Sequence, residues 1–153
     1  MRLQNRQIHD PKIIEDIIRR SPVCRLGLVD GDRPYVVPLC FGFENRTLYF
    51  HCADEGYKLD LIRNNNKVCI EFDIDQQLIS GEKACNWSMN YKSVIAFGRA
   101  FIVTDPALKR AALDVIMNHY ARSPHDYSQP SLDKVCIIKI DIEEMSCKVR
   151  QES

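Results

Sequence analysis

The sequence predicts a mainly β protein with some helices, in which six antiparallel strands form a small barrel decorated by helices. Strand-like apolar runs recur along the chain, and several are joined by connections of only a few residues, which suit antiparallel neighbours. Two segments, at about residues 10–20 and 105–120, carry apolar residues at helical spacing instead. The 153 residues contain no repeat or linker, so we expect one domain spanning 1–153.

The first helix is predicted at residues 10–20, "DPKIIEDIIRR". Asp10 is a good N-cap, and Pro11 suits the first helical position because the missing N–H would be unpaired there anyway. Two arginines end the segment, where positive charge favours a helix C-terminus. At helical spacing, one apolar face is expected from Ile13, Ile14, Ile17 and Ile18.

Three strands follow, at residues 23–29, 35–43 and 47–53. The turn "DGDRP" joins the first two, and Asp-Gly between strand-like runs is a strong hairpin signal. Pro38 lies inside the second strand and has no N–H to donate. It therefore indicates a sheet edge, a bulge or a break that faces a ligand.

The remaining elements alternate between helix and strand. The segment 56–66 is predicted as a short helix whose core face contains Leu59 and Ile62, and 75–91 as a polar, irregular stretch. The helix that ends near Tyr120 is opened by Thr104 or Asp105 with Pro106. Its predicted core face is Leu108, Ala112, Val115 and Ile116, with Tyr120 at its end. The other three strands are expected at 67–74, 93–104 and 134–145.

Composition narrows the class of protein. Lys and Arg number 21, and so do Asp and Glu, so the net charge of +0 lacks the basic excess typical of a nucleic-acid binder. No apolar run approaches the roughly 20 residues that span a bilayer. The first residues also lack the apolar core of a signal peptide. We therefore expect a cytoplasmic protein with no nucleic-acid or membrane partner.

Seven cysteines are present, but no two form a C-x-x-C pair. Structural zinc sites usually take their ligands from such pairs, so we expect neither a zinc site nor a disulfide framework. Four of the cysteines lie inside apolar strand-like runs, where a reduced thiol behaves as a small core side chain. These four are Cys24, Cys40, Cys69 and Cys136.

The candidate site is the segment "HCADEGYK" at residues 51–58. His51 and Cys52 are neighbours in a strand, so they point to opposite faces and cannot bind one metal ion or act as a catalytic pair. A strand, a loop with Gly56 and a helix with Lys58 together suit a phosphate group, because helix N-termini attract anions. The alternatives are a half-buried His51 bonded to backbone and a solvated surface Lys58.

The runs "YVVPLCFGF", "LYFHCADEGYKLDLIRNNNKVCIEFDID" and "SGEKACNWSMNYKSVIAFGRAFIV" together resemble the flavin-binding split-barrel family. The resemblance is to its nitroimidazole-resistance (Nim) reductase branch, relatives of pyridoxamine 5′-phosphate oxidase. It implies a split barrel and a homodimer with FMN at the subunit interface, with FAD as the alternative cofactor. The tail, with only Lys148 and Arg150, lacks the arginine cluster of many pyridoxamine phosphate oxidases, so that activity is not expected.

The resemblance also implies roles for particular residues. The "VVPL" strand would line the isoalloxazine ring, His51 to Ala53 would follow the ribityl chain, and Lys58 would hold the phosphate. Cys52 stands where relatives often have Ser or Thr, which weakens one expected contact. Trp87, Met89 and Tyr91 would cover the ring from the partner subunit, with dimer packing alone as the alternative. Ser93 and Val94 would supply a hydroxyl and backbone contacts near the phosphate. The implied cofactor-binding set is Val36, Val37, Pro38, Leu39, His51, Cys52, Ala53, Lys58, Trp87, Tyr91, Ser93 and Val94.

The resemblance therefore predicts a flavin-dependent oxidoreductase that takes electrons from NADH or NADPH and reduces small planar acceptors such as nitroaromatics. His51 is the predicted catalytic residue, since a histidine can donate a proton near neutral pH. The alternatives are a flavin- or haem-binding split barrel without turnover, in which His51 could be an axial haem ligand, and a barrel that only dimerises.

Overall fold

The fold is built on one antiparallel sheet of eight strands. Seven of them follow the order β3-β2-β6-β7-β8-β5-β4, and β1 pairs with β8. The structure is a computed structural model that describes residues 4–122 and 124–152. The strands are β1 (Gln7–Ile8), β2 (Cys24–Asp30), β3 (Arg33–Leu39), β4 (Gly42–Glu44), β5 (Thr47–Ala53), β6 (Lys67–Ile79), β7 (Ser88–Val103) and β8 (Val135–Arg150). The helices are α1 (Pro11–Arg20), α2 (Tyr57–Asn64), α3 (Pro106–Tyr120) and α4 (Gln129–Lys134).

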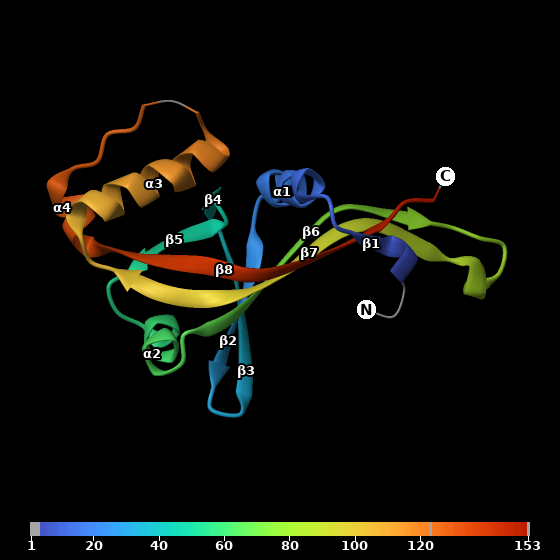
Figure 1. Cartoon of the computed structure of the whole chain (residues 1–153), viewed down its shortest axis with the longest axis horizontal. Helices are drawn as coiled ribbons and strands as arrows, with labels where there is room; N and C mark the ends of the chain where they lie inside the picture. Colours follow the sequence, from blue (N-terminus) through green and yellow to red (C-terminus); the bar gives the residue numbers. More distant parts are fainter. Residues whose placement is uncertain (1–3, 123, 153) are drawn as a thin grey trace.

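The predicted antiparallel, helix-decorated split barrel is confirmed, although the sheet has eight strands rather than six. Within the described ranges, the end strands β3 and β4 do not pair with each other, so the barrel stays open. Figure 1 shows α1 and α3 on one side of the sheet and α2 with the β2–β3 hairpin on the other.

The first helix forms as predicted, because the Asp10 side chain accepts a hydrogen bond from the Lys12 N–H at 2.9 Å. The expected apolar face is correct for three of its four isoleucines, Ile14, Ile17 and Ile18. Ile13 is 41% exposed, because it lies beside the stripe that packs on the barrel.

The predicted strand 35–43 is in fact two strands. Cys40 and Phe41 separate β3 from β4, which belong to opposite ends of the sheet. Cys40 is exposed at this break, and Cys69 is only half-buried and lines a surface cavity, so the prediction of these two as core thiols is wrong. Pro38 lies on β3, which among the described strands pairs with β2 alone and is therefore an edge strand, as one of the three alternatives for Pro38 proposed.

The polar stretch 75–91 is strand at both ends, at 75–79 and 88–91, so its prediction as irregular is correct only for 80–87. β6 continues to Ile79 and pairs with the start of β7 at Ser88, beyond a bulge at Asp75, whose φ is +58°. Figure 1 shows this hairpin extending well past the barrel. An exposed hairpin has little need of apolar residues, so its sequence lacks the alternation that marks a half-buried strand.

Two apolar clusters hold the fold together. The larger one fills the barrel, and α1 and α2 contribute to it through side chains such as Ile17 and Leu59. In the smaller cluster, Ala112 and Ile116 of α3 pack on Ile137 of β8. Leu108 and Tyr120 are 60% and 45% exposed, so their prediction as part of the α3 core face is wrong. This arrangement leaves α2 at the end of β5, where the candidate site begins.

No helix in the described parts of the chain is long and apolar enough to cross a membrane. All seven cysteines are free thiols. Among residues 4–122 and 124–152, no three His, Cys, Asp or Glu side chains gather as metal ligands.

Candidate functional site

The start of α2 offers backbone N–H groups that no side chain within residues 4–122 and 124–152 caps. Gly56 precedes the helix with a φ of +137°, a conformation that favours glycine. Its carbonyl accepts hydrogen bonds from the N–H groups of Leu59 and Asp60. The first-turn N–H groups of Tyr57 and Lys58 have no intrahelical acceptor, so they are available to an anion.

Lys58 lies close to the end of β5. Burial raises the pKa of the Cys52 thiol to about 11, Cys136 adds to the rise, and the positive charge of Lys58 opposes it. Lys58 is half-buried, and within residues 4–122 and 124–152 it forms no ion pair. The structure therefore brings together a free ammonium group, an uncapped helix N-terminus and the strand that carries His51.

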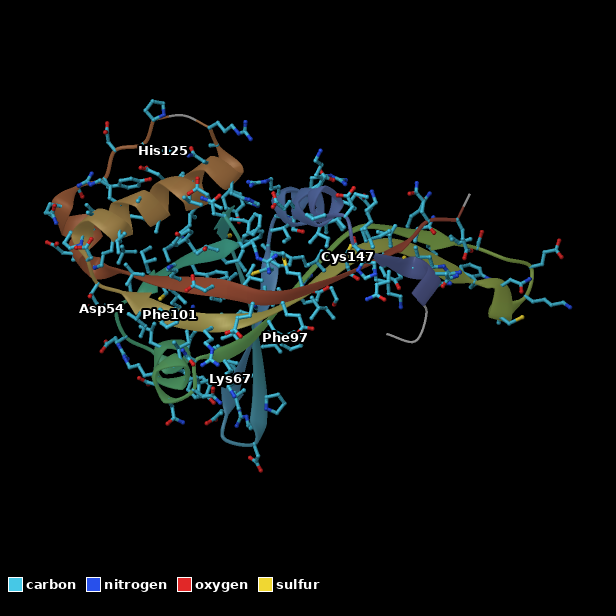
Figure 2. The ribbon with its side chains drawn as sticks, viewed as in Figure 1. Asp54, Lys67, Phe97, Phe101, His125 and Cys147 are labelled. Atoms are coloured by element: carbon cyan, nitrogen blue, oxygen red, sulfur yellow. The ribbon has the colours of Figure 1, made fainter. Side chains whose placement is uncertain are left out.

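Three carboxylates also lie in this region: Asp54 and Glu55 before the helix, and Asp60 in its first turn. Figure 2 labels Asp54 in the connection between β5 and α2. All three are exposed, so water screens their charges. They nonetheless oppose an anion, so any affinity for phosphate depends on Lys58 and the backbone N–H groups.

Side-chain contacts join α2 to the β2–β3 hairpin. The rings of Tyr35 and Tyr57 meet edge to face, with their centroids 5.0 Å apart. The Tyr57 hydroxyl donates a hydrogen bond to Asp30, and this bond is the main reason that the pKa of Tyr57 is raised. The "VVPL" residues of β3 follow Tyr35 directly, so these contacts connect their strand to the helix that carries Lys58.

His51 is exposed on β5 and lies opposite Ile137 of β8. Its ring makes no hydrogen bond within the described residues, so a half-buried, backbone-bonded histidine is not what the structure shows. Cys52 lies opposite Cys136, and the strand alternation directs it to the other face. His51 is thus free to contact a ligand.

A row of outward-facing residues crosses four strands and was not predicted from the sequence. Val36 lies opposite Gly27, Gly27 opposite Cys69, and Cys69 opposite Phe97. A cavity of about 460 Å³ lies over this row. Val36 is 63% exposed and Phe97 49% exposed, and Figure 2 labels Phe97 on β7. The sequence of β7 could have indicated this row. It contains apolar residues at both odd and even positions, as in strands that are covered on both faces.

The remaining predicted residues lie elsewhere. Ser93 is opposite Lys148 of β8, whereas His51 is level with Val103, ten residues further along β7. At about 3.3 Å per residue, this is about 33 Å along the strand. Trp87 and Tyr91 lie still further from His51. A single chain therefore does not bring these residues to Lys58.

Val94 differs from the other predicted residues. Its side chain is fully buried in the barrel, and β7 is paired with β6 on one edge and β8 on the other. Neither its side chain nor a free strand edge is available to a ligand. The expected direct contact from Val94 therefore lacks a geometric basis within one chain.

Comparison with known proteins gives the family. A sequence profile described as pyridoxamine 5′-phosphate oxidase matches residues 10–149. The chain is 38% identical to a crystal structure from Bacteroides thetaiotaomicron that is provisionally assigned as a 5-nitroimidazole antibiotic resistance protein. The match covers 94% of this chain and 86% of that one, with a TM-score of 0.85. No curated protein matches the chain.

Two more distant structures share the fold. The flavocytochrome Anf3 from Azotobacter vinelandii is 22% identical, with a TM-score of 0.88 over 99% of this chain and 72% of that one. A FAD- and haem-binding protein from Mycobacterium smegmatis is 16% identical, with a TM-score of 0.88 over 96% of this chain and 74% of that one. At these identities the likeness concerns the fold alone. The profile match and the 38% identical structure show that the chain belongs to the pyridoxamine 5′-phosphate oxidase family.

Proposed function

We propose that the protein binds FMN between the two subunits of a homodimer and acts as an oxidoreductase on small planar acceptors such as nitroaromatics. Membership of the pyridoxamine 5′-phosphate oxidase family supports a flavin as cofactor. The 38% identity to the provisionally assigned 5-nitroimidazole resistance protein supports the acceptor class.

The observation that carries the proposal is the start of α2, which is uncapped in the described part of the chain, with Lys58, which forms no ion pair there, beside Cys52. These groups fit the single terminal phosphate of FMN, because N–H donors and an ammonium charge reinforce each other at a helix N-terminus. The Cys52 thiol is a weaker hydrogen-bond donor than a hydroxyl, so Lys58 carries most of the phosphate affinity.

In this proposal the isoalloxazine ring of the flavin lies against β3. Val36 to Leu39 lie on an edge strand, so the edge that faces away from β2 has backbone groups free to bond the polar rim of the isoalloxazine. Pro38 lacks an N–H, and an edge strand tolerates this without loss of a ladder bond. Val36, which is 63% exposed, would cover apolar ring surface.

A second copy of the chain would complete the site. Trp87, Met89, Tyr91 and Ser93 lie on or beside the extended β6–β7 hairpin, far from Lys58 of their own chain. The exposed apolar row that includes Val36 and Phe97 would be covered in such a dimer. Burial of this surface would supply the hydrophobic driving force for association.

Bound flavin supplies the electron-transfer chemistry, with NADH or NADPH as the electron donor. The protein binds the cofactor, excludes water from it and positions the acceptor. His51 is exposed and makes no hydrogen bond to any described residue, so it would donate a hydrogen bond or a proton to the acceptor.

Anaerobic reduction tests the proposal. The purified protein should show flavin absorbance that NADH or NADPH bleaches, and addition of a 5-nitroimidazole should restore it. A flavin band that neither NADH nor NADPH bleaches would favour the alternative of a flavin-binding protein without turnover. A Soret band in place of the flavin bands would favour the haem-binding alternative and overturn the proposal.

A further inference from the structure

A second cavity, of about 440 Å³, lies among α1, β4 and the C-terminal end of α3. In Figure 1 this end of α3 lies beside α1, on the side of the sheet away from α2. Side chains from three elements and from the residues after α3 surround the cavity. Its lining consists of Arg19, Phe43, Glu44, Val115, Asn118, His119 and Arg122.

Two guanidinium groups border this cavity. Arg19 donates a hydrogen bond to the Phe43 carbonyl at 3.3 Å and lies over the Phe43 ring, 5.2 Å from its centroid. Its ion pair with Glu15 is long, at 3.8 Å, and exposed, so much of its hydrogen-bonding capacity remains free. Arg122 forms no ion pair within residues 4–122 and 124–152.

The walls of the cavity are fixed by contacts that do not use these arginines. His119 Nε2 lies 2.7 Å from the Ser21 carbonyl oxygen. The Tyr120 hydroxyl donates to the Pro22 carbonyl at 2.8 Å and accepts from the Phe41 N–H at 3.1 Å. These bonds hold α3 against the segments before β2 and β4. The backbone around the cavity is therefore fixed before a ligand enters, and the ordering cost of binding falls mainly on the exposed arginine side chains.

We propose that this cavity binds a small oxyanion, a phosphate or carboxylate group, between Arg19 and Arg122. Planar guanidinium groups match both oxyanions through paired N–H donors, and the Asn118 amide adds a neutral donor. Glu44 is the one carboxylate in the lining, and it opposes the anion.

The cavity is separate from the Lys58 region. Glu44 lies opposite Thr47 at the start of β5, whereas Lys58 acts on Cys52 near the end of that strand. Five residues of strand span about 17 Å. The inference therefore does not depend on flavin binding, and either proposal can fail while the other holds.

Titration of the full-length ¹⁵N-labelled protein with inorganic phosphate, and separately with acetate, tests this site by NMR. Chloride at matched ionic strength is the control for screening. We expect saturable shifts of the Asn118 and His119 amides with at least one oxyanion and none with chloride. Phosphate alone would identify a phosphate ligand, and acetate alone a carboxylate ligand. Shifts that do not saturate, or that chloride reproduces, would overturn the proposal.

Four variants complete the test. Arg122→Gln should weaken oxyanion binding about fivefold or more. Arg110 is an exposed arginine on α3 outside the cavity, so Arg110→Gln should leave the affinity unchanged. Glu44→Gln should tighten binding, a gain that misfolding cannot produce. Lys58→Ala should leave the Asn118 shifts unchanged. Equal effects of the two arginine variants, or loss of the shifts in Lys58→Ala, would refute the site.

Discussion

His51 and Ser93 lie about 33 Å apart along β7, because His51 is level with Val103 and Ser93 precedes Val103 by ten residues. Both belong to the set of residues expected around one flavin. A site that uses both must take them from different chains. The distance therefore makes dimerisation a requirement of the proposed function.

Phe97→Glu should convert the proposed dimer to a monomer and release its flavin. Phe97 is 49% exposed in the row that also contains Val36, and a carboxylate buried in an apolar interface is costly without a partner. Light scattering coupled to gel filtration would measure the mass. Ile13→Glu, at a 41% exposed position on α1, should remain dimeric. A Phe97→Glu dimer that retained its flavin would place the interface elsewhere.

Lys58→Ala should weaken FMN binding about tenfold or more, because it removes the cation nearest the proposed phosphate position. Fluorescence titration of the apoprotein with FMN would measure the change. Lys12→Ala removes an exposed lysine of α1 and should leave the affinity unchanged. Equal affinity in wild type and Lys58→Ala would remove Lys58 from the site.

Glu55→Gln should change FMN affinity in the opposite direction. Glu55 is exposed immediately before Gly56, where its charge opposes a phosphate at the start of α2. We expect tighter binding at low salt and a smaller gain at high salt, because salt screens the repulsion. A loss of affinity in Glu55→Gln would show that the phosphate lies elsewhere.

His51→Ala should preserve the fold and reduce turnover of a nitroaromatic acceptor. The ring is exposed and makes no internal hydrogen bond in the described chain, so thermal stability should change little. The rate at saturating acceptor should fall, by roughly 100-fold if His51 is the proton donor. His9→Ala, another exposed histidine, is the matched control. Wild-type kinetics in His51→Ala would end its catalytic assignment.

Stability should fall in alkali, in part because of Cys24. Burial raises the pKa of this thiol to about 12, so the folded state holds the proton more tightly than the unfolded state does. This contribution is complete below about pH 9 and is lost as the pH rises toward about 12. Denaturant unfolding at pH 8 and pH 10.5 should show a smaller loss in Cys24→Ala than in wild type. Cys85→Ala, at an exposed cysteine, should lose as much as wild type.

Local signals in the sequence were sufficient for much of the fold. The Asp10 cap and the isoleucine stripe determine α1, and the Asp-Gly turn determines the β2–β3 hairpin. The break at Cys40 could not be predicted in this way. The break depends on tertiary packing around β4. Helix α3 lies so close to this strand that a Cβ on Gly42 would be 2.5 Å from the Ile116 nitrogen.

The candidate site likewise has a part that local sequence patterns predict and a part that they do not. Sequence alone indicated Gly56 and Lys58, because a strand–loop–helix junction is a local pattern. The exposed row from Val36 to Phe97 arises from the register of four strands, which no local pattern specifies. The buried position of Val94 likewise follows from which face of β7 the barrel closes upon.

Mass spectrometry of the small molecule released when the purified protein is denatured tests the central claim most directly. We predict FMN, at about one molecule per subunit. Release of FAD would retain the flavin but remove the terminal-phosphate role assigned to Lys58 and the start of α2. Release of haem without flavin, or no release after incubation with excess FMN, would contradict the proposed function.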